Sequence, residues 1–228
     1  MTINGKWEWK KFLGKYYLKY EGRVFSIINT KKIYTNSYWD LFLPFIEMFN
    51  EPRVIMIGLG GGTTLYQVRK FFKNVHFETV EISMKSFEMA SKFIDMKNEI
   101  VHICDGYDFV LSCSKTFDII ILDAYDSSGI PIKFLDKEFI DNIARILNNG
   151  GFFLINYALT IQARVRLKNF LNLLRTYFNV YLIGPTLIEN NIVIVASKYE
   201  KNEIFEKLNK SKLRKRLIKK LMSMKENI

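Results

Sequence analysis

The 228-residue sequence has little cysteine, histidine and proline, and the first two shortages exclude classes of site. Its two cysteines, Cys104 and Cys113, form no Cys-x-x-Cys pair, so the sequence does not indicate a disulfide framework. Cys104 lies in an apolar run, and we interpret it as a core residue. The two histidines, His76 and His102, have no ligand spacing between them, so we expect no metal site.

The sequence also lacks an uninterrupted apolar run of about 18 residues, the length that a membrane-spanning helix needs. We therefore expect no membrane partner. Residues 1–8 contain no apolar signal core, which favours a cytoplasmic location. Hydrophobic residues are abundant at 49%, with 19 Phe and 12 Tyr. That is ample for one large domain with a small appendage.

Positive charge is in excess, with a formal net charge of +11. From Tyr199 to Ile228, ten Lys or Arg side chains accompany four Glu, a net charge of +6. Nucleic acid or an acidic surface is therefore a partner to consider, although a solvated Lys-rich helix explains the charge more simply. An apolar stripe at helical spacing should pack on the domain or on a second subunit: Leu213, Leu217, Ile218 and Leu221.

The first 50 residues predict a small β-rich region and a helix. Segments 15–20 and 23–28 are rich in β-formers and flank a break with a glycine, which predicts a hairpin. A third short strand is expected at 32–35. A helix is expected from Asp40 to Phe49, with a proline tolerated in its first turn.

From Arg53 onward strands and helices alternate, which predicts an α/β fold with a mostly parallel, seven-stranded sheet. The last two strands should pair antiparallel through turns at Gly184-Pro185 and Asn190-Asn191. The expected strands are 53–59, 75–81, 99–104, 117–123, 151–157, 178–183 and 191–197. The expected helices are 64–73, 84–96, 106–113, 134–147, 160–176 and 200 to the end. We divide the chain into a hairpin region with its lead-in helix (1–50), a nucleoside-binding α/β domain (51–198) and a basic C-terminal helix (199–228).

A glycine cluster after the first of these strands predicts a nucleotide-binding turn. Glycines let the backbone turn tightly and approach a ligand, and the following helix offers free N–H groups. A glycine turn that only changes the chain direction would look similar. Glu81 ends the next strand, about 20 residues further on, where a carboxylate suits a ribose diol. This spacing favours the nucleoside over a merely solvated carboxylate.

Carboxylates also end other strands, at the edge of the sheet where ligands of such folds lie. Asp123 and Asp126 stand three apart after a fully apolar strand. One can bind a substrate ammonium group while the other takes a proton from it. From turn preferences alone, a turn-capping role for Asp126 is an equally good explanation. An acidic cleft in a basic protein favours a cationic ligand, or one with hydroxyls and amines.

Taken in order, these motifs resemble the spermidine synthase family, the aminopropyltransferases built on the Rossmann-like class I S-adenosylmethionine-dependent methyltransferase fold. The resemblance covers roughly residues 15–197, and the set is specific although no single motif is. It rests on Gly58-Leu-Gly-Gly-Gly62, Val80-Glu-Ile82, Asp105-Gly-Tyr-Asp-Phe109, Phe117-Asp-Ile-Ile-Ile-Leu-Asp-Ala-Tyr-Asp126 running on to Gly129-Ile-Pro131, Asp136-Lys-Glu-Phe139, Leu147-Asn-Asn-Gly-Gly151 and Tyr38-Trp-Asp40.

The resemblance implies a role for each matching position. Asp126 would be the base that takes a proton from the attacking amine, Asp123 would hold that amine, and Tyr38 would help to orient it. The implied donor is decarboxylated S-adenosylmethionine and the implied acceptor is a di- or polyamine. No metal is implied, and we expect a homo-oligomer of two or more copies. The residues implied at the nucleoside are Gly58, Gly60, Gly61, Gly62, Glu81 (ribose hydroxyls), Asp105 (adenine amino group) and Gly106.

The sequence departs from the family pattern at Gly61, where the family commonly has an aspartate that binds the amine end of the decarboxylated donor. Trp39 replaces a Gln or His. Ordinary S-adenosylmethionine is therefore also open as donor, and with it a methyltransferase that acts on a small amine or another nucleophile. A further alternative is a scaffold without catalysis that binds nucleic acid or a partner. We favour the amine transferase because carboxylates in the cleft would repel phosphate, and because a slot of Asp40, Asp123 and Asp126 fits an extended dication.

Overall fold

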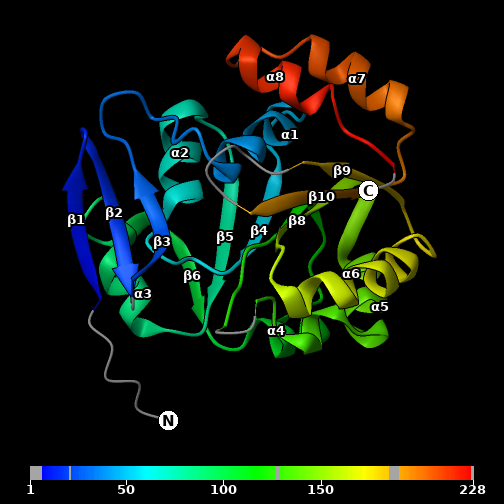
Figure 1. Cartoon of the computed structure of the whole chain (residues 1–228), viewed down its shortest axis with the longest axis horizontal. Helices are drawn as coiled ribbons and strands as arrows, with labels where there is room; N and C mark the ends of the chain where they lie inside the picture. Colours follow the sequence, from blue (N-terminus) through cyan, green and yellow to red (C-terminus); the bar gives the residue numbers. More distant parts are fainter. Residues whose placement is uncertain (1–6, 21, 127–128, 185–189, 227–228) are drawn as a thin grey trace.

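The computed structural model of the chain describes residues 7–20, 22–126, 129–184 and 190–226. In this part of the chain, seven strands form one sheet in the order β6-β5-β4-β7-β8-β10-β9 (Figure 1). Neighbours pair in parallel except β10, which runs antiparallel to both β8 and β9. The strands are β4 Arg53–Ile57, β5 His76–Glu81, β6 Ile100–Ile103, β7 Phe117–Leu122, β8 Leu147–Ala158, β9 Asn179–Ile183 and β10 Asn191–Ser197.

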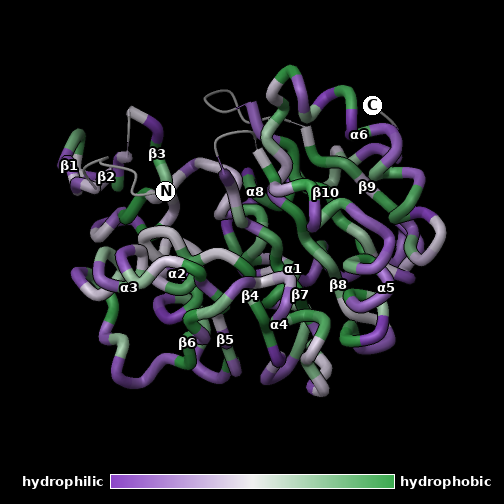
Figure 2. Tube along the Cα trace, turned by 90° about the horizontal axis from the view of Figure 1, so that it is seen from below, coloured by the Kyte–Doolittle hydropathy of each residue, from purple (hydrophilic) through white to green (hydrophobic). Residues whose placement is uncertain are grey.

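Helices cover both faces of this sheet, as the alternation predicts. Helices α1, α2, α3, α7 and α8 belong to the apolar cluster on one face, and α4, α5 and α6 to the cluster on the other. Hydrophobic segments run through the central strands β4, β7 and β8 (Figure 2), because strands buried on both faces need no polar side. The helices are α1 Leu43–Glu47, α2 Thr63–Phe71, α3 Met84–Ala90, α4 Gly106–Ser112, α5 Lys137–Ile146, α6 Ile161–Leu174, α7 Lys201–Asn209 and α8 Lys215–Leu221.

Helix α5 illustrates how local sequence produces these elements. The Asp136 side chain accepts a hydrogen bond from the backbone N–H of Phe139 at 2.8 Å and caps the N-terminus. The apolar residues recur at helical spacing and are fully buried: Phe139, Ile140, Ile143 and Ile146. The strand expected at 151–157 starts earlier, because β8 begins at Leu147, and its register against β7 shifts between Leu147 and Phe152.

A separate antiparallel sheet has the order β1-β2-β3, formed by Glu8–Phe12, Lys15–Tyr20 and Arg23–Ile28. The predicted hairpin is confirmed, but the third strand is β1 rather than residues 32–35. Those residues form a turn around the Asn29 side chain, which accepts from the N–H groups of Lys31 and Lys32 and donates to the carbonyl of Tyr34. These side-chain hydrogen bonds compete with strand pairing.

Three other expectations need correction or fall outside the described residues. Cys104 is exposed rather than in the core, because it follows β6, an edge strand. The expected helix 84–96 ends at Ala90, and a 3-10 turn follows at Met96–Asn98. Strands β9 and β10 pair antiparallel as expected, whereas Pro185 of the predicted turn lies outside the described residues.

The basic tail folds as two helices rather than one. After α7 the chain turns, and the Glu47 carboxylate accepts from the Ser211 hydroxyl and from the backbone N–H of Lys212, the latter at 2.9 Å. Leu217 and Leu221 of α8 are then buried in the same cluster as the 3-10 turn η1, Tyr38–Leu41. The apolar stripe therefore packs on the chain's own domain, over α1 and η1 (Figure 1).

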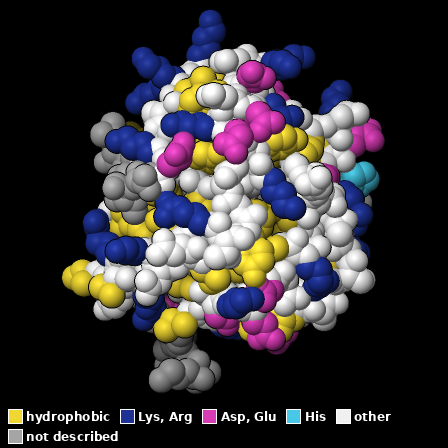
Figure 3. Space-filling view, turned by 90° about the vertical axis from the view of Figure 1, so that its right-hand side faces the viewer, with side chains coloured by type: hydrophobic (Ala, Val, Ile, Leu, Met, Phe, Trp, Pro, Cys, Tyr) yellow, Lys and Arg dark blue, Asp and Glu magenta, His cyan; other side chains and the backbone are white. Residues whose placement is uncertain are grey.

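Positive charge is scattered over the face of the molecule that Figure 3 shows. On the face that Figure 3 shows, Lys and Arg side chains are spread out, with Asp and Glu among them, and do not gather in one patch. Among the described residues, no helix is long and apolar enough to cross a membrane.

We expect Glu78→Gln to lower the free energy of unfolding by about 2 kcal/mol at pH 7. Glu78 on β5 is nearly buried and contacts Lys115 Nζ and His102 Nε2, each at 2.8 Å. Burial raises the pKa of Glu78, but the hydrogen bonds from Lys115 and His102 outweigh it and leave that pKa below its usual value. A carboxyl pKa lowered by folding stabilises at neutral pH, and this stabilisation is lost as pH falls through the folded value.

Urea unfolding of the parent and the variant at pH 7 and at acid pH measures this difference, which should shrink towards zero in acid. Glu88→Gln, in the exposed pair with Lys85, serves as the control and should change stability by less than about 0.5 kcal/mol. An equal loss for Glu78→Gln at both pH values would contradict the assignment.

Candidate active site

A cavity of about 940 Å³ opens at the carboxyl ends of β4, β5 and β7, under the N-terminal sheet. Its walls combine apolar and aromatic side chains with convergent polar groups, which is usual for small-molecule sites. The predicted edge of the sheet is therefore where the cavity lies. The polar residues that line it include Glu81, Asp105, Asp123, Asp126, Lys133 and Asn156.

The glycine turn is held tightly from two sides. Gly58 has a φ of +100°, and an added Cβ would lie 2.3 Å from the backbone oxygen of Asp123, so no other residue fits. The Glu81 carboxylate accepts from the backbone N–H groups of Leu59 at 2.8 Å and Gly60 at 3.2 Å. Glu81 thus fixes the turn and also lines the cavity.

Gly61 belongs to the same turn but does not line the cavity. Its N–H donates to the Ser26 hydroxyl at 2.6 Å. A Cβ at this position would lie 2.7 Å from the ring of Trp9 and 2.8 Å from Cβ of Ser26. The N-terminal sheet therefore occupies the space that a side chain at position 61 would need. Gly62 precedes α2 as its N-cap with a φ of +82°.

Asp105 lies at the other end of the cavity, at the N-terminus of α4. It accepts from the backbone N–H of Tyr107 at 2.8 Å and forms an ion pair with Lys133. Burial raises the pKa of the Asp105 carboxyl, but the hydrogen bonds from Lys133 and Tyr107 outweigh it and hold that pKa below its usual value. Gly106 allows close packing, since a Cβ there would lie 2.5 Å from Ile57.

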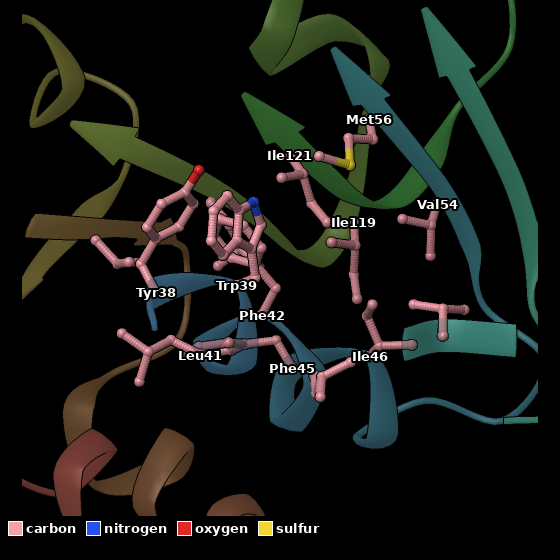
Figure 4. Close-up of a cluster of buried hydrophobic side chains, with 14 of the residues drawn as sticks. Tyr38, Trp39, Leu41, Phe42, Phe45, Ile46, Val54, Met56, Ile119 and Ile121 are labelled. Carbon is pink, nitrogen blue, oxygen red and sulfur yellow. The ribbon is translucent and has the colours of Figure 1, made fainter. Parts of the chain in front are cut away.

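Asp123 is surrounded by hydrogen-bond donors. The Tyr38 hydroxyl and the Trp39 indole N–H each donate to it at 3.1 Å, and the Asn156 side-chain amide donates at 2.7 Å. Figure 4 shows the Tyr38 hydroxyl and the Trp39 nitrogen on one side of the buried cluster, directed away from Phe45 and Ile46. Donors of this kind stabilise a carboxylate in its charged form. Trp39 therefore supplies a donor although it departs from the family pattern.

Asp126 lies on the turn after β7, and its side chain is exposed at the cavity. Its backbone N–H donates to the carbonyl of Gly129 at 2.9 Å, which fixes the turn. Ser127 and Ser128 lie outside the described residues.

Of the three aspartates expected to form a slot for the ligand, Asp40 is placed wrongly. Asp40 is buried and does not line the cavity. Its carboxylate accepts from the backbone N–H groups of Thr35 and Asn36 and from the Gln67 amide at 2.6–2.8 Å. Asp40 therefore stabilises the turn before η1 instead of meeting a ligand.

The structure places most of the predicted site residues at one cavity: Gly58, Gly60, Glu81, Asp105, Gly106, Tyr38, Asp123 and Asp126. Gly61 and Gly62, which were also predicted to bind the nucleoside, do not line it. Sequence reasoning missed Lys133 and the role of Trp9. No local pattern marks these side chains, because each acts through an element distant in sequence. Among the described residues, no group of three or more His, Cys, Asp or Glu could hold a metal ion.

Comparison with known proteins identifies a matching family model. The model of the spermine/spermidine synthase domain matches residues 41–207, well over half of the chain. The polyamine aminopropyltransferase of Pectobacterium carotovorum is 32% identical over 120 residues, which cover 49% of this chain and 42% of that protein. The eEF1A lysine and N-terminal methyltransferase of Xenopus laevis is 29% identical over 119 residues, covering 46% and 17%. The chain thus spans less than half the length of these curated relatives.

Among solved structures, a probable spermidine synthase from Corynebacterium glutamicum superposes with a TM-score of 0.74. The superposition covers 96% of this chain and 91% of that one, at 16% sequence identity. At this identity the likeness concerns the fold. Together with the strand order, it confirms the predicted α/β fold of the methyltransferase type, with a mostly parallel seven-stranded sheet and a small N-terminal sheet.

Proposed function

The chain belongs to the spermine/spermidine synthase domain family, and from this premise we propose that it transfers an aminopropyl group from decarboxylated S-adenosylmethionine to an amine. The observation that carries the proposal is the pair of carboxylates, Asp123 and Asp126, at one cavity with the glycine turn. The names of its relatives support the same reaction class.

The nucleoside half of the donor suits one end of this cavity. Glu81 lies beside the glycine turn, where its carboxylate would accept from ribose hydroxyls. Asp105 and Lys133 offer an acceptor and a donor of hydrogen bonds at the other wall. An adenine base presents both an amino group and ring nitrogens that accept, so the pair matches its edge.

The amine half of the site divides the work between two aspartates. Asp123, charged and fixed by Tyr38, Trp39 and Asn156, would hold the acceptor ammonium group. Asp126, on the exposed turn, would take one proton from that nitrogen. The nitrogen lone pair then forms a bond to the carbon next to the sulfonium, the carbon–sulfur bond breaks, and its electrons neutralise the sulfur. Placement and charge supply most of the acceleration.

Methyl transfer from intact S-adenosylmethionine is the second candidate. The specific observation in its favour is position 61, which has no carboxylate and no room for one. The sequence relative named as a lysine and N-terminal methyltransferase points the same way. In this version the same nucleoside site is used and the acceptor nitrogen attacks the methyl carbon instead.

Calorimetric binding of the two donors tests the proposal. We expect the decarboxylated donor to bind at least tenfold more tightly than intact S-adenosylmethionine, a difference of about 1.4 kcal/mol, and putrescine or spermidine to strengthen that binding. Glu81→Gln should weaken both donors, whereas the surface variant Glu88→Gln should weaken neither. Preference for the intact donor with indifference to diamines would replace aminopropyl transfer by methyl transfer, and binding of neither would reject both.

A further inference from the structure

A chain of hydrogen bonds links Asp123 to strand β10. Asn156 on β8 is fully buried and donates from its side-chain amide to Asp123 Oδ1 at 2.7 Å. Its side-chain oxygen accepts from the amide of Asn191, the first residue of β10, at 2.8 Å. The Tyr125 hydroxyl donates to the backbone carbonyl of Asn156. We call Asn191, Asn156 and Asp123 the amide relay.

The Asp123 carboxylate at the end of the amide relay determines which group donates and which accepts in each of its hydrogen bonds. A carboxylate only accepts hydrogen bonds, so Asn156 must present its NH₂ group to Asp123. Its oxygen then faces Asn191, which must donate in turn. If Asn156 rotated by half a turn, its oxygen would oppose the Asp123 carboxylate, and two acceptors would meet in a buried place.

We propose that Asn156 is the positioning residue of this site and that Asn191 sets its orientation, so that Asp123 stays charged and aimed at the acceptor amine. Asn156 acts through Asp123 and does not touch the reacting atoms. The inference rests on the proposed function for its meaning in catalysis. The geometry of the relay can be tested without activity.

The sharpest test is Asn191→Asp, a change of nearly equal size outside direct contact with Asp123. While it is protonated, the introduced carboxyl group can donate to Asn156 as the parent asparagine does, whereas the ionised carboxylate cannot. The ionised form therefore leaves Asn156 without its donor and favours the rotated amide. The Trp39 N–H signal and the affinity for putrescine both depend on Asp123, so both should match the parent at low pH. They should depart from the parent as pH rises through the pKa of the introduced carboxyl group.

The readout is the indole N–H of Trp39, because that group donates to Asp123. Its ¹H–¹⁵N NMR signal reports on the carboxylate and is assigned by comparison with Trp7→Phe and Trp9→Phe variants. A parallel titration measures calorimetric binding of putrescine. The other titratable groups that line the cavity are unchanged in the variant, so the parent profile accounts for them: Tyr17, Arg23, Tyr38, Glu81, Asp105, Tyr125, Asp126 and Lys133.

We expect the Trp39 signal of Asn191→Asp to depart from the parent only at higher pH, with about a tenfold loss of putrescine affinity there. Asn190→Asp is the matched control, because it adds the same charge one residue away and Asn190 donates to the carbonyl of Leu159 instead. Its Trp39 titration should follow the parent. A parent-like titration of Asn191→Asp over the whole range would overturn the proposal.

Asn156→Asp provides a second variant in case Asn191→Asp does not fold. It places a second carboxylate beside Asp123, and two such groups hold a proton more tightly than one. The Trp39 signal should then titrate at a higher pH than in the parent, and an unchanged titration would also overturn the proposal. A failure of the proposed function would look different: putrescine would not bind the parent, while the NMR titrations would keep their order.

Discussion

Asp126→Asn should lower kcat for transfer to a diamine by about 10²–10⁴-fold, the usual contribution of a general base. The amide cannot take the proton that the attacking nitrogen must lose. Asp126 is exposed on a turn held by backbone hydrogen bonds to Gly129, so the substitution should leave the fold intact. Donor affinity should stay within about twofold, because the residues that we propose to bind the nucleoside lie elsewhere in the cavity. Steady-state rates at saturating diamine and calorimetry of the donor measure the two quantities.

Asp123→Asn is the companion variant that separates the two aspartates. It removes the charge that would hold the ammonium group. It also leaves a neutral amide among the hydrogen-bond donors that surround the carboxylate of the parent. Its main effect should therefore be a higher KM for the diamine, whereas that of Asp126→Asn is a lower kcat. If Asp126→Asn kept its kcat, the base would have to be another group, and the assignment of roles would be rejected.

Gly61→Asp should lower the free energy of unfolding by about 4 kcal/mol instead of restoring the family's donor contact. The Cβ alone would lie within 2.8 Å of Trp9 and Ser26, and the carboxylate would be forced into the packing between the two sheets. The loss combines overpacking with the burial of a charge. Urea unfolding measures the stability, and calorimetry shows whether the decarboxylated donor binds any better than to the parent.

Trp9→Ala/Gly61→Asp tests the steric cause. Removing the indole opens the space that the new side chain needs, so the double variant should be more stable than the sum of the two single effects indicates. Strict additivity would mean that Trp9 is not what excludes a side chain at position 61. A stable Gly61→Asp protein with improved donor binding would show that the N-terminal sheet moves away readily.

The fold can be predicted because its signals are local. Apolar runs such as Ile119–Leu122 and the stripe at Phe139 and Ile143 identify buried strands and helices from a few neighbouring residues. The glycine turn is equally clear in the sequence, since the positive φ of Gly58 and its close approach to Asp123 demand glycine. Glu81 and Asp105 can also be predicted to lie at the cavity, because both stand at or just after the end of a strand.

The remaining features depend on partners distant in the sequence. Asp40 resembles a cleft carboxylate in the sequence, but Gln67 and the backbone N–H groups at 35 and 36 bind it. The break in the tail comes from Glu47, more than 160 residues away. The charged strand β1 has no apolar alternation, so only its pairing with β2 reveals it. Side chains that act across elements leave no periodic signal.

The packing of α8 over η1 has a consequence for protein synthesis. The glycine turn, Glu81 and Asp105 all precede residue 110, so a growing chain contains this part of the cavity lining early. Tyr38 and Trp39 also emerge early, but the cluster that holds them includes Leu217 and Leu221. A nascent chain shorter than this lacks the cover of η1, and with it the support for two donors to Asp123. The 3-10 turn η1 is therefore translated early but is among the last parts of the cavity lining to be covered by its packing partners.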